Sequence, residues 1–184
     1  CLNKIRTPEF RGELSQNTKS AFRLNGILEK PPDETPTGRR ISILTDGSNV
    51  SGMNMAIRAV ARLAINGGIE VTGIKGGFSG LVQGTASAFP LEWNMLEMSG
   101  VLRRAGTLLG VSGSEIPLSE QDFSAMRNQV KALKIDGLVV IGNTATYEYA
   151  AKLADRIPIP VVAIPAALNC NIPGTDWVIG MDSA

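Results

Sequence analysis

From Arg39 onward, short apolar segments alternate with longer amphipathic ones, and this alternation leaves few folds open to the chain. The short segments are rich in β-branched residues, whereas the long ones repeat apolar side chains at helical spacing. Strands separated by helices are typical of parallel pairing with helical crossovers. The sequence therefore predicts an α/β fold, a Rossmann-like open and mostly parallel sheet with helices on both faces. The predicted strands are ISILTDG, IEVTGIKGG, AGTLLG, DGLVVIGN and VVAIP.

Three helices are predicted between these strands. One ends at a Gly-Gly pair, one begins at Ser119 as N-cap, and one ends before Pro158, all of which are ordinary helix boundaries. They are GMNMAIRAVARLAING, SEQDFSAMRNQVKALK and TATYEYAAKLADRI. Ligands of such sheets bind beyond the carboxyl ends of the strands, so the following loops should share one edge and carry the function. These loops are residues 45–54, 110–114, 142–146 and 165–176.

Residues 1–38 differ from the rest in composition. They are polar and end in the proline-rich EKPPDETPTGRR, which favours an extended connector, and we predict a linker or arm there. Residues 39–184 are predicted to be one α/β domain. Because the chain begins with Cys1 and not with methionine, we expect it to be a processed chain, an engineered fragment or part of a longer polypeptide.

Charge and composition exclude several classes of function. The net charge of +1 and the lack of a sustained basic run argue against nucleic-acid and membrane partners. No apolar run approaches the roughly 20 residues of a membrane span, and two cysteines give no disulfide framework, so a cytoplasmic location is expected. The absence of histidine excludes imidazole-based triads and the usual zinc sites, and we predict no metal.

Two local patterns are candidates for anion binding. The loop TDGSNVSGMN places small residues before a helix whose first amides could receive an anion, although ordinary turn chemistry explains it equally well. It is neither a Walker A sequence nor a G-x-G-x-x-G sequence. Arg58 and Arg62 are four residues apart and share a helix face, where they could bind one anion or simply be solvated.

The order of these loops resembles the phosphofructokinase family. The matching segments are LTDGSNVSGMNMAIRAVAR, GIKGGFSGL, AGTLLG, IDGLVVIGNTATY and VVAIPAALNCNIPGTDWVIGMDSA, which together span residues 40–184. RGELSQNTKSAFRLN resembles the segment that joins the two halves of tandem, eukaryotic-type enzymes. The resemblance implies the start of a second half, with a large domain that stops before the second domain.

The resemblance also implies ATP and Mg²⁺ as ligands of active members, but this chain departs from their nucleotide loops. Where the family has Gly-Gly-Asp, the chain has Gly47, Ser48 and Asn49, so one glycine has gained a side chain and one acid has become an amide. The phosphate-binding arginine corresponds to Gly113, which carries no cation. We therefore predict a degenerate nucleotide site.

The positions that correspond to the family's metal-binding and catalytic acids also have neutral side chains in this chain. Asn143 and Thr144 stand in the loop where the family keeps its magnesium aspartate, and a neutral hydroxyl is a poor substitute for a carboxylate. The proton acceptor corresponds to Asn169 and its acidic neighbour to Asn171. Since an amide does not accept a proton at neutral pH, the expectation is no catalytic residue, no metal and no cofactor in this segment.

The sequence thus predicts a non-catalytic phosphofructokinase domain with a regulatory or structural role. The alternatives are an active sugar-phosphate kinase with unusual residues and an α/β scaffold without a ligand. Candidate residues for a sugar-bisphosphate or nucleotide effector are Arg58, Arg62, Asn169 and Asn171, the two arginines because the resemblance implies an effector phosphate there. The expected partners are the remaining part of the same enzyme or further copies of the chain, because an incomplete domain should expose apolar surface.

Overall fold

The computed structural model describes residues 37–92, 104–112, 119–169, 172 and 174–183. It contains a five-stranded sheet with the strand order β3-β2-β1-β4-β5. Four strands are parallel and β3 alone is antiparallel, to β2, so the predicted open and mostly parallel sheet is confirmed. The strands are β1 (Arg40–Thr45), β2 (Glu70–Ile74), β3 (Ala88–Pro90), β4 (Gly137–Gly142) and β5 (Val161–Pro165).

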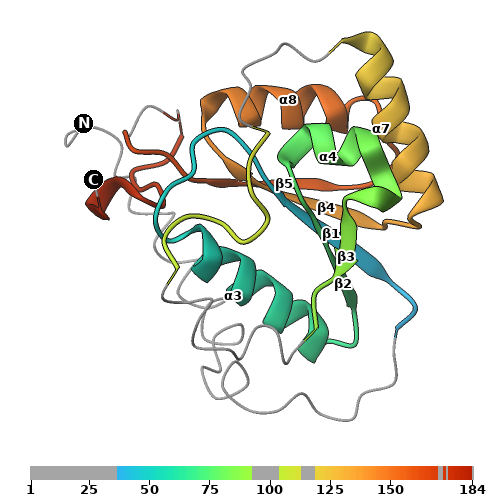
Figure 1. Cartoon of the computed structure of the whole chain (residues 1–184), viewed down its shortest axis with the longest axis horizontal. Helices are drawn as coiled ribbons and strands as arrows, with labels where there is room; N and C mark the ends of the chain where they lie inside the picture. Colours follow the sequence, from blue (N-terminus) through green and yellow to red (C-terminus); the bar gives the residue numbers. More distant parts are fainter. Residues whose placement is uncertain (1–36, 93–103, 113–118, 170–171, 173, 184) are drawn as a thin grey trace, which may run out of the picture.

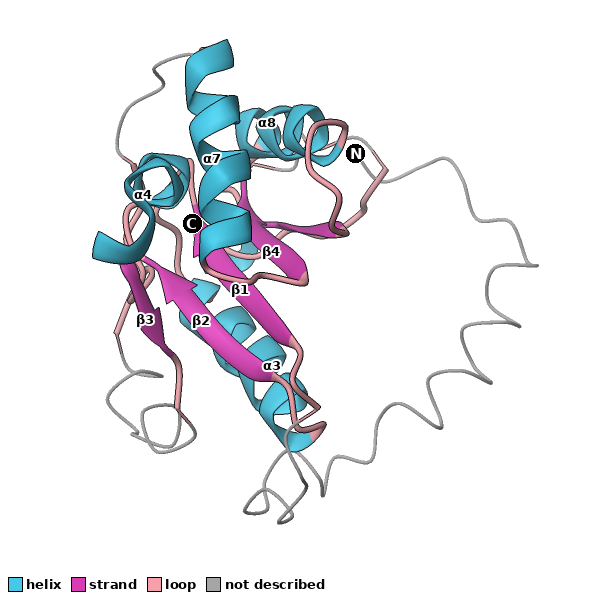
Figure 2. Ribbon diagram, turned by 90° about the vertical axis from the view of Figure 1, so that its right-hand side faces the viewer, coloured by secondary structure: helices cyan, strands magenta, loops and turns pink. Residues whose placement is uncertain are grey.

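Helices cover both faces of the sheet (Figure 1). Helix α3 lies alone against one face, while α4, α7 and α8 lie against the other, an arrangement that Figure 2 shows from a second direction. The three predicted helices are present, shorter than predicted by one to three residues at their ends. The helices are α3 (Met53–Asn66), α4 (Gly77–Gln83), α7 (Glu120–Ala132) and α8 (Thr144–Ala154), with short 3-10 turns η1 (Gly84–Ala86) and η2 (Met181–Ser183).

Two hydrophobic clusters lie on either side of the sheet. Because successive residues of a strand point to opposite faces, Ile43 packs in the α3 cluster and Leu44 packs in the cluster under α4, α7 and α8. In the same way β4 contributes Val140 to one cluster and Ile141 to the other. Strands buried on both faces read as continuous apolar runs, which is why β1 and β4 were recognisable in the sequence.

The predicted strand AGTLLG is wrong. Residues 105–110 form turns, and the third strand of the chain is instead the three-residue β3. Gly106 and Gly110 have φ angles of 80° and 70°, which an extended strand cannot contain. The segment is fixed mainly by side chains of other elements, described below, so its apolar sequence does not reflect pairing in a sheet.

Ser119 is the N-cap of α7, as predicted. Its hydroxyl accepts a hydrogen bond from the amide of Asp122 at 3.2 Å, and the carboxylate of Asp122 accepts one from the amide of Ser119 at 2.8 Å. This reciprocal pair is a capping box. The hydrogen bonds from Ser119 lower the pKa of the Asp122 carboxyl because they stabilise its charged form.

The described part of the chain begins at Thr37. The amide of Thr37 donates to the carbonyl of Gly68 at 2.9 Å, which attaches the chain to the loop before β2. The predicted arm, residues 1–38, lies almost wholly outside the described residues. No helix in the described part of the chain is both long and apolar enough to cross a membrane.

Candidate ligand-binding rim

The carboxyl ends of the parallel strands and the loops that follow them form one edge of the sheet. The amide of Asp46 donates to the carbonyl of Ile141 at 3.0 Å, and the amide of Ala166 donates to the carbonyl of Gly142 at 2.8 Å, which brings the ends of β1, β4 and β5 together. The predicted sharing of one edge is confirmed for the described parts of these loops. We call residues 45–54, 107–112, 142–146 and 165–169 the rim.

The strand order places the topological switch point of the sheet within the rim, between β1 and β4, and we call this part of the rim the β1–β4 crevice. After β1 the chain enters α3 on one face of the sheet, and after β4 it enters α8 on the opposite face (Figure 1). The two loops therefore leave the neighbouring strand ends in opposite directions. In open α/β sheets this switch point is the usual place for a ligand.

Asp46 occupies this crevice and is buried, with 6% of its surface exposed. One carboxylate oxygen accepts hydrogen bonds from the Gly47 amide at 2.8 Å and from the amide and hydroxyl of Ser112 at 3.1 and 2.6 Å. The other accepts from the amide of Phe78 at 3.0 Å. Every one of these partners donates to the carboxylate, which thereby connects three loops.

Neighbouring glycines make room for this arrangement. A Cβ atom on Gly77 would lie 2.6 Å from the carboxylate carbon of Asp46, so any larger residue there would displace the carboxylate. Sequence analysis did not identify Asp46 as a functional residue. Its signal was an acid directly after a buried strand and before a glycine, but T-D-G is also an ordinary turn sequence.

The positions predicted to form a degenerate nucleotide loop lie at the same crevice. Gly47 has a φ of 76°, and a Cβ atom there would lie 2.6 Å from the side chain of Asn143, so the first loop and the β4 loop touch. Ser48 is half-buried beside them. Asn49 is exposed, and its side-chain oxygen accepts a hydrogen bond from the amide of Thr107 at 2.9 Å.

Asn143 and Thr144 begin α8. The side-chain oxygen of Asn143 accepts hydrogen bonds from the amide and the hydroxyl of Thr146 at 3.2 and 3.1 Å, which makes Asn143 the N-cap of the helix. Thr144 is the first helical residue and is half-buried. An asparagine in this position therefore has a structural use that does not depend on any ligand.

Asn54 is a second residue that sequence analysis missed. Only 2% of its surface is exposed; its side chain accepts from the Leu108 amide at 2.7 Å and donates to the Arg104 carbonyl at 3.1 Å. Thr45 adds a hydrogen bond to the carbonyl of Gly110 at 2.7 Å. These contacts fix the segment that had been predicted to be a strand.

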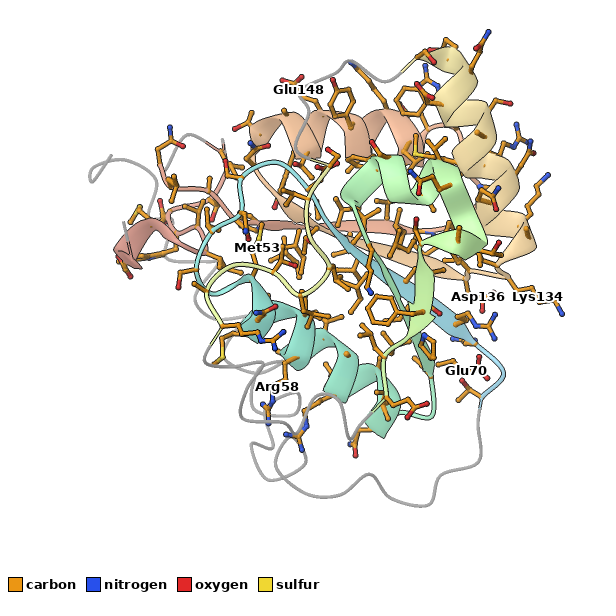
Figure 3. The ribbon with its side chains drawn as sticks, viewed as in Figure 1. Met53, Arg58, Glu70, Lys134, Asp136 and Glu148 are labelled. Atoms are coloured by element: carbon orange, nitrogen blue, oxygen red, sulfur yellow. The ribbon has the colours of Figure 1, made fainter. Side chains whose placement is uncertain are left out.

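The remaining predicted positions that the structure describes are divided between α3 and the loop after β5. Asn169 is exposed in the loop after β5, while Gly113 and Asn171 lie outside the described residues. Arg58 and Arg62 lie one turn apart on α3, not at the rim; Figure 3 shows Arg58 on α3, beyond the first turn that carries Met53. Arg58 is half-buried and Arg62 is 3% exposed.

The rim has few ionisable side chains. Asp46 is its one acidic residue, and its sequence contains no lysine or arginine. Tyr147, just below the rim, donates its hydroxyl to the carbonyl of Ala163 at 3.1 Å, and burial raises the pKa of that hydroxyl. Among the described residues, no three Cys, Asp or Glu side chains gather as a metal site would require.

A groove of about 590 Å³ lies between α7 and the loop after α8. Two of its charged groups engage one another, since Arg156 bonds Glu120 at 2.7 Å, and Arg156 also stacks on the ring of Phe123 at 4.7 Å. The groove is open and lies away from the ends of the strands. The rim therefore remains the better candidate for a ligand.

Comparison with known proteins identifies the fold's relatives. The family described as "Phosphofructokinase" matches residues 40–184. The ATP-dependent 6-phosphofructokinases of Thermotoga neapolitana and Alkaliphilus metalliredigens are 39% and 37% identical over 145 and 146 residues, which is 79% of this chain and 44% of each relative. The chain thus spans less than half the length of these relatives.

A solved structure gives the same result. Phosphofructokinase from Saccharomyces cerevisiae superposes with a TM-score of 0.69 at 26% identity, over 79% of this chain and 22% of that one. The matched residues include the whole described sheet and the rim. The family match over residues 40–184, the similarity to these relatives and the likeness to this solved structure agree, and the chain therefore belongs to the phosphofructokinase family.

Proposed function

We propose that this chain is part of a glycolytic 6-phosphofructokinase, and that this segment contributes regulation or subunit structure and does not transfer phosphate itself. The observation that carries the proposal is the chemistry of the rim, whose one charged group is a carboxylate already enclosed by four donors. The activity of the whole enzyme is proposed from its relatives, which are named ATP-dependent 6-phosphofructokinases.

Phosphoryl transfer needs positive charge around the transferred group, from a metal ion and from lysine or arginine. The rim contains neither cationic residue, and the loop in which the resemblance implies a magnesium aspartate begins instead with the helix-capping Asn143. Asn169 stands where a base is implied, and general-base assistance contributes about 10²–10⁴ in rate. These losses support a non-catalytic role.

The proposed partner is the remaining part of the enzyme, in the same polypeptide or another copy, where a better-preserved site would bind ATP and fructose 6-phosphate in the cytoplasm. A sugar-bisphosphate or nucleotide effector is the proposed ligand of this segment. Arg58 and Arg62 on α3 are the candidates for the phosphate of such an effector. Asn169 and Asn171, in the loop after β5, are candidates for a separate site that would hydrogen-bond a sugar hydroxyl or phosphate. No metal or cofactor is proposed here.

Two other functions are separated from this one by experiment. Calorimetric titrations with MgATP, fructose 6-phosphate and fructose 2,6-bisphosphate would be combined with a coupled assay of turnover. We expect no turnover, and binding of the bisphosphate with loss of that binding in Arg58→Ala. Turnover at an ordinary enzymatic rate would establish an active kinase, and no binding of any compound would favour a scaffold.

A further inference from the structure

The β1–β4 crevice contains an anion that belongs to the chain itself. We propose that Asp46 is the residue that excludes phosphate groups from this crevice, so that any phosphate-bearing ligand of the segment binds elsewhere. The inference deepens and rests on the proposed non-catalytic function. It concerns the selectivity of the rim, for which the residue types alone gave no indication.

The first support is position. Asp46 follows the central strand β1, and its backbone bonds the end of β4 through the carbonyl of Ile141. A Cβ atom on Gly142 would lie 2.5 Å from the carbonyl oxygen of Asp46, so the two strand ends are in close contact at this residue. A ligand at the switch point would therefore meet the Asp46 loop.

The second support is that the hydrogen-bond donors around Asp46 are already occupied. Phosphate binding in proteins depends on backbone amides and hydroxyls that converge on the anion. Here the amides of Gly47, Phe78 and Ser112 and the hydroxyl of Ser112 already converge on the carboxylate of Asp46. The amides of Thr107 and Thr146 are likewise taken by the side chains of Asn49 and Asn143.

The third support is charge. Two like charges a few ångströms apart repel strongly where burial lowers the effective dielectric constant. Asp46 is buried, and the residues of the rim include no lysine or arginine. Lys75, which follows β2 at the same edge, places its ammonium over the ring of Phe89, 4.8 Å from the ring centroid. A phosphate group entering the crevice would meet an anion and find its donors occupied, whereas a neutral group would meet neither obstacle to the same degree.

The experiment measures the dissociation constant of pyrophosphate by calorimetry for the wild-type chain, Asp46→Asn and Asp46→Ser. Asp46→Asn removes the charge with little change of shape, and Asp46→Ser also vacates space. Asp155→Asn is the matched control, because it removes the same charge from an exposed residue at the far end of α8. Circular dichroism and thermal unfolding establish that each variant is folded.

We expect both Asp46 variants to bind pyrophosphate at least tenfold more tightly than the wild type and than Asp155→Asn. The increase in pyrophosphate affinity should persist when Arg58→Ala is added to each Asp46 variant. That result would show that the additional pyrophosphate does not bind at α3. Adenosine, which carries no phosphate, should bind the wild type and the variants equally. Unchanged pyrophosphate binding in folded Asp46→Asn or Asp46→Ser would overturn the inference, as would a gain that disappears with Arg58→Ala.

The turnover assay tests the proposed function independently of the pyrophosphate titrations. Turnover of fructose 6-phosphate by the wild-type chain would contradict that function, whatever the pyrophosphate titrations show. Conversely, an inactive wild type whose pyrophosphate affinity does not respond to Asp46 would retain the proposed function and remove only the inference.

Discussion

The two ends of the sheet hold their polar groups in opposite ways. At the amino end, Arg40 bonds Glu70 and the carbonyl of Leu133, and its amide donates to Asp136, in an open cluster of charged side chains. At the carboxyl end, the rim uses a buried carboxylate and neutral amides. Figure 3 shows Glu70, Lys134 and Asp136 gathered at the amino end, far from Met53 of the rim.

The two ends of the sheet therefore contribute differently to the stability of the chain and to the choice of ligand. Exposed ion pairs contribute little because water screens them, so the amino end tolerates change. Buried polar groups cost free energy when a partner is lost, so the hydrogen bonds of the rim fix its loops and restrict what those loops can bind. The following predictions test this contrast, from the largest expected effect to the smallest.

Asp46→Ala should lower the free energy of unfolding by about 3 kcal/mol, because four donors lose a charged acceptor in a buried place. Denaturant unfolding measures the loss. The comparison at the amino end is Asp136→Ala, which removes one exposed acceptor of the Arg40 amide and should cost about 1 kcal/mol or less. Equal losses in the two variants would contradict the contrast.

Asn54→Ala should cost about 2 kcal/mol, since its buried amide group makes two hydrogen bonds to the segment 104–108. Hydrogen exchange of the Leu108 amide should accelerate along with the loss of stability. Asn128→Ala on the exposed surface of α7 is the control and should change stability little. If the Leu108 amide stayed as protected as in the wild type, Asn54 would not fix this loop.

Lys134→Gly should stabilise the chain by about 0.5–1 kcal/mol. Lys134 has a φ of 52°, a left-handed conformation that glycine adopts without the steric cost. Lys131→Gly, three residues earlier within α7, should instead cost about 1 kcal/mol because the residue there is helical. Thermal unfolding of the two variants measures the opposite signs, and a loss of stability in both would disprove the conformational argument.

The capping box should give a small dependence of stability on pH. The pKa of Asp122 is lower in the folded chain than in the unfolded one, so its contribution is present above the unfolded pKa and is lost as the pH falls through the folded pKa. Asp122→Asn should remove this part of the acid dependence. An unfolding profile identical to that of the wild type across the acid range would show that the interaction is negligible.

The sequence predicted most of the architecture but less of the site. The apolar runs of β1, β4 and β5 and the helical spacing of α3, α7 and α8 are local patterns, and each element formed where its pattern indicated. Residues 105–110 had a strand-like composition but are turns, because their hydrogen-bond partners include Asn49 and Asn54 from the first loop and α3. The sequence did not predict β3 or α4. Strand β3 is too short, and α4 too short and rich in glycine, to show a clear apolar repeat.

By itself, the sequence determined the α/β alternation, the family and the residue types present in the rim, because all of these depend on nearest neighbours or on order along the chain. Only the tertiary structure decided what Asp46 does. Its donors at Phe78 and Ser112 are 32 and 66 positions away, and they meet the carboxylate only after parallel pairing has brought the ends of the strands to one edge. A carboxylate's neighbours, and therefore its ability to exclude another anion, are set by distance in space.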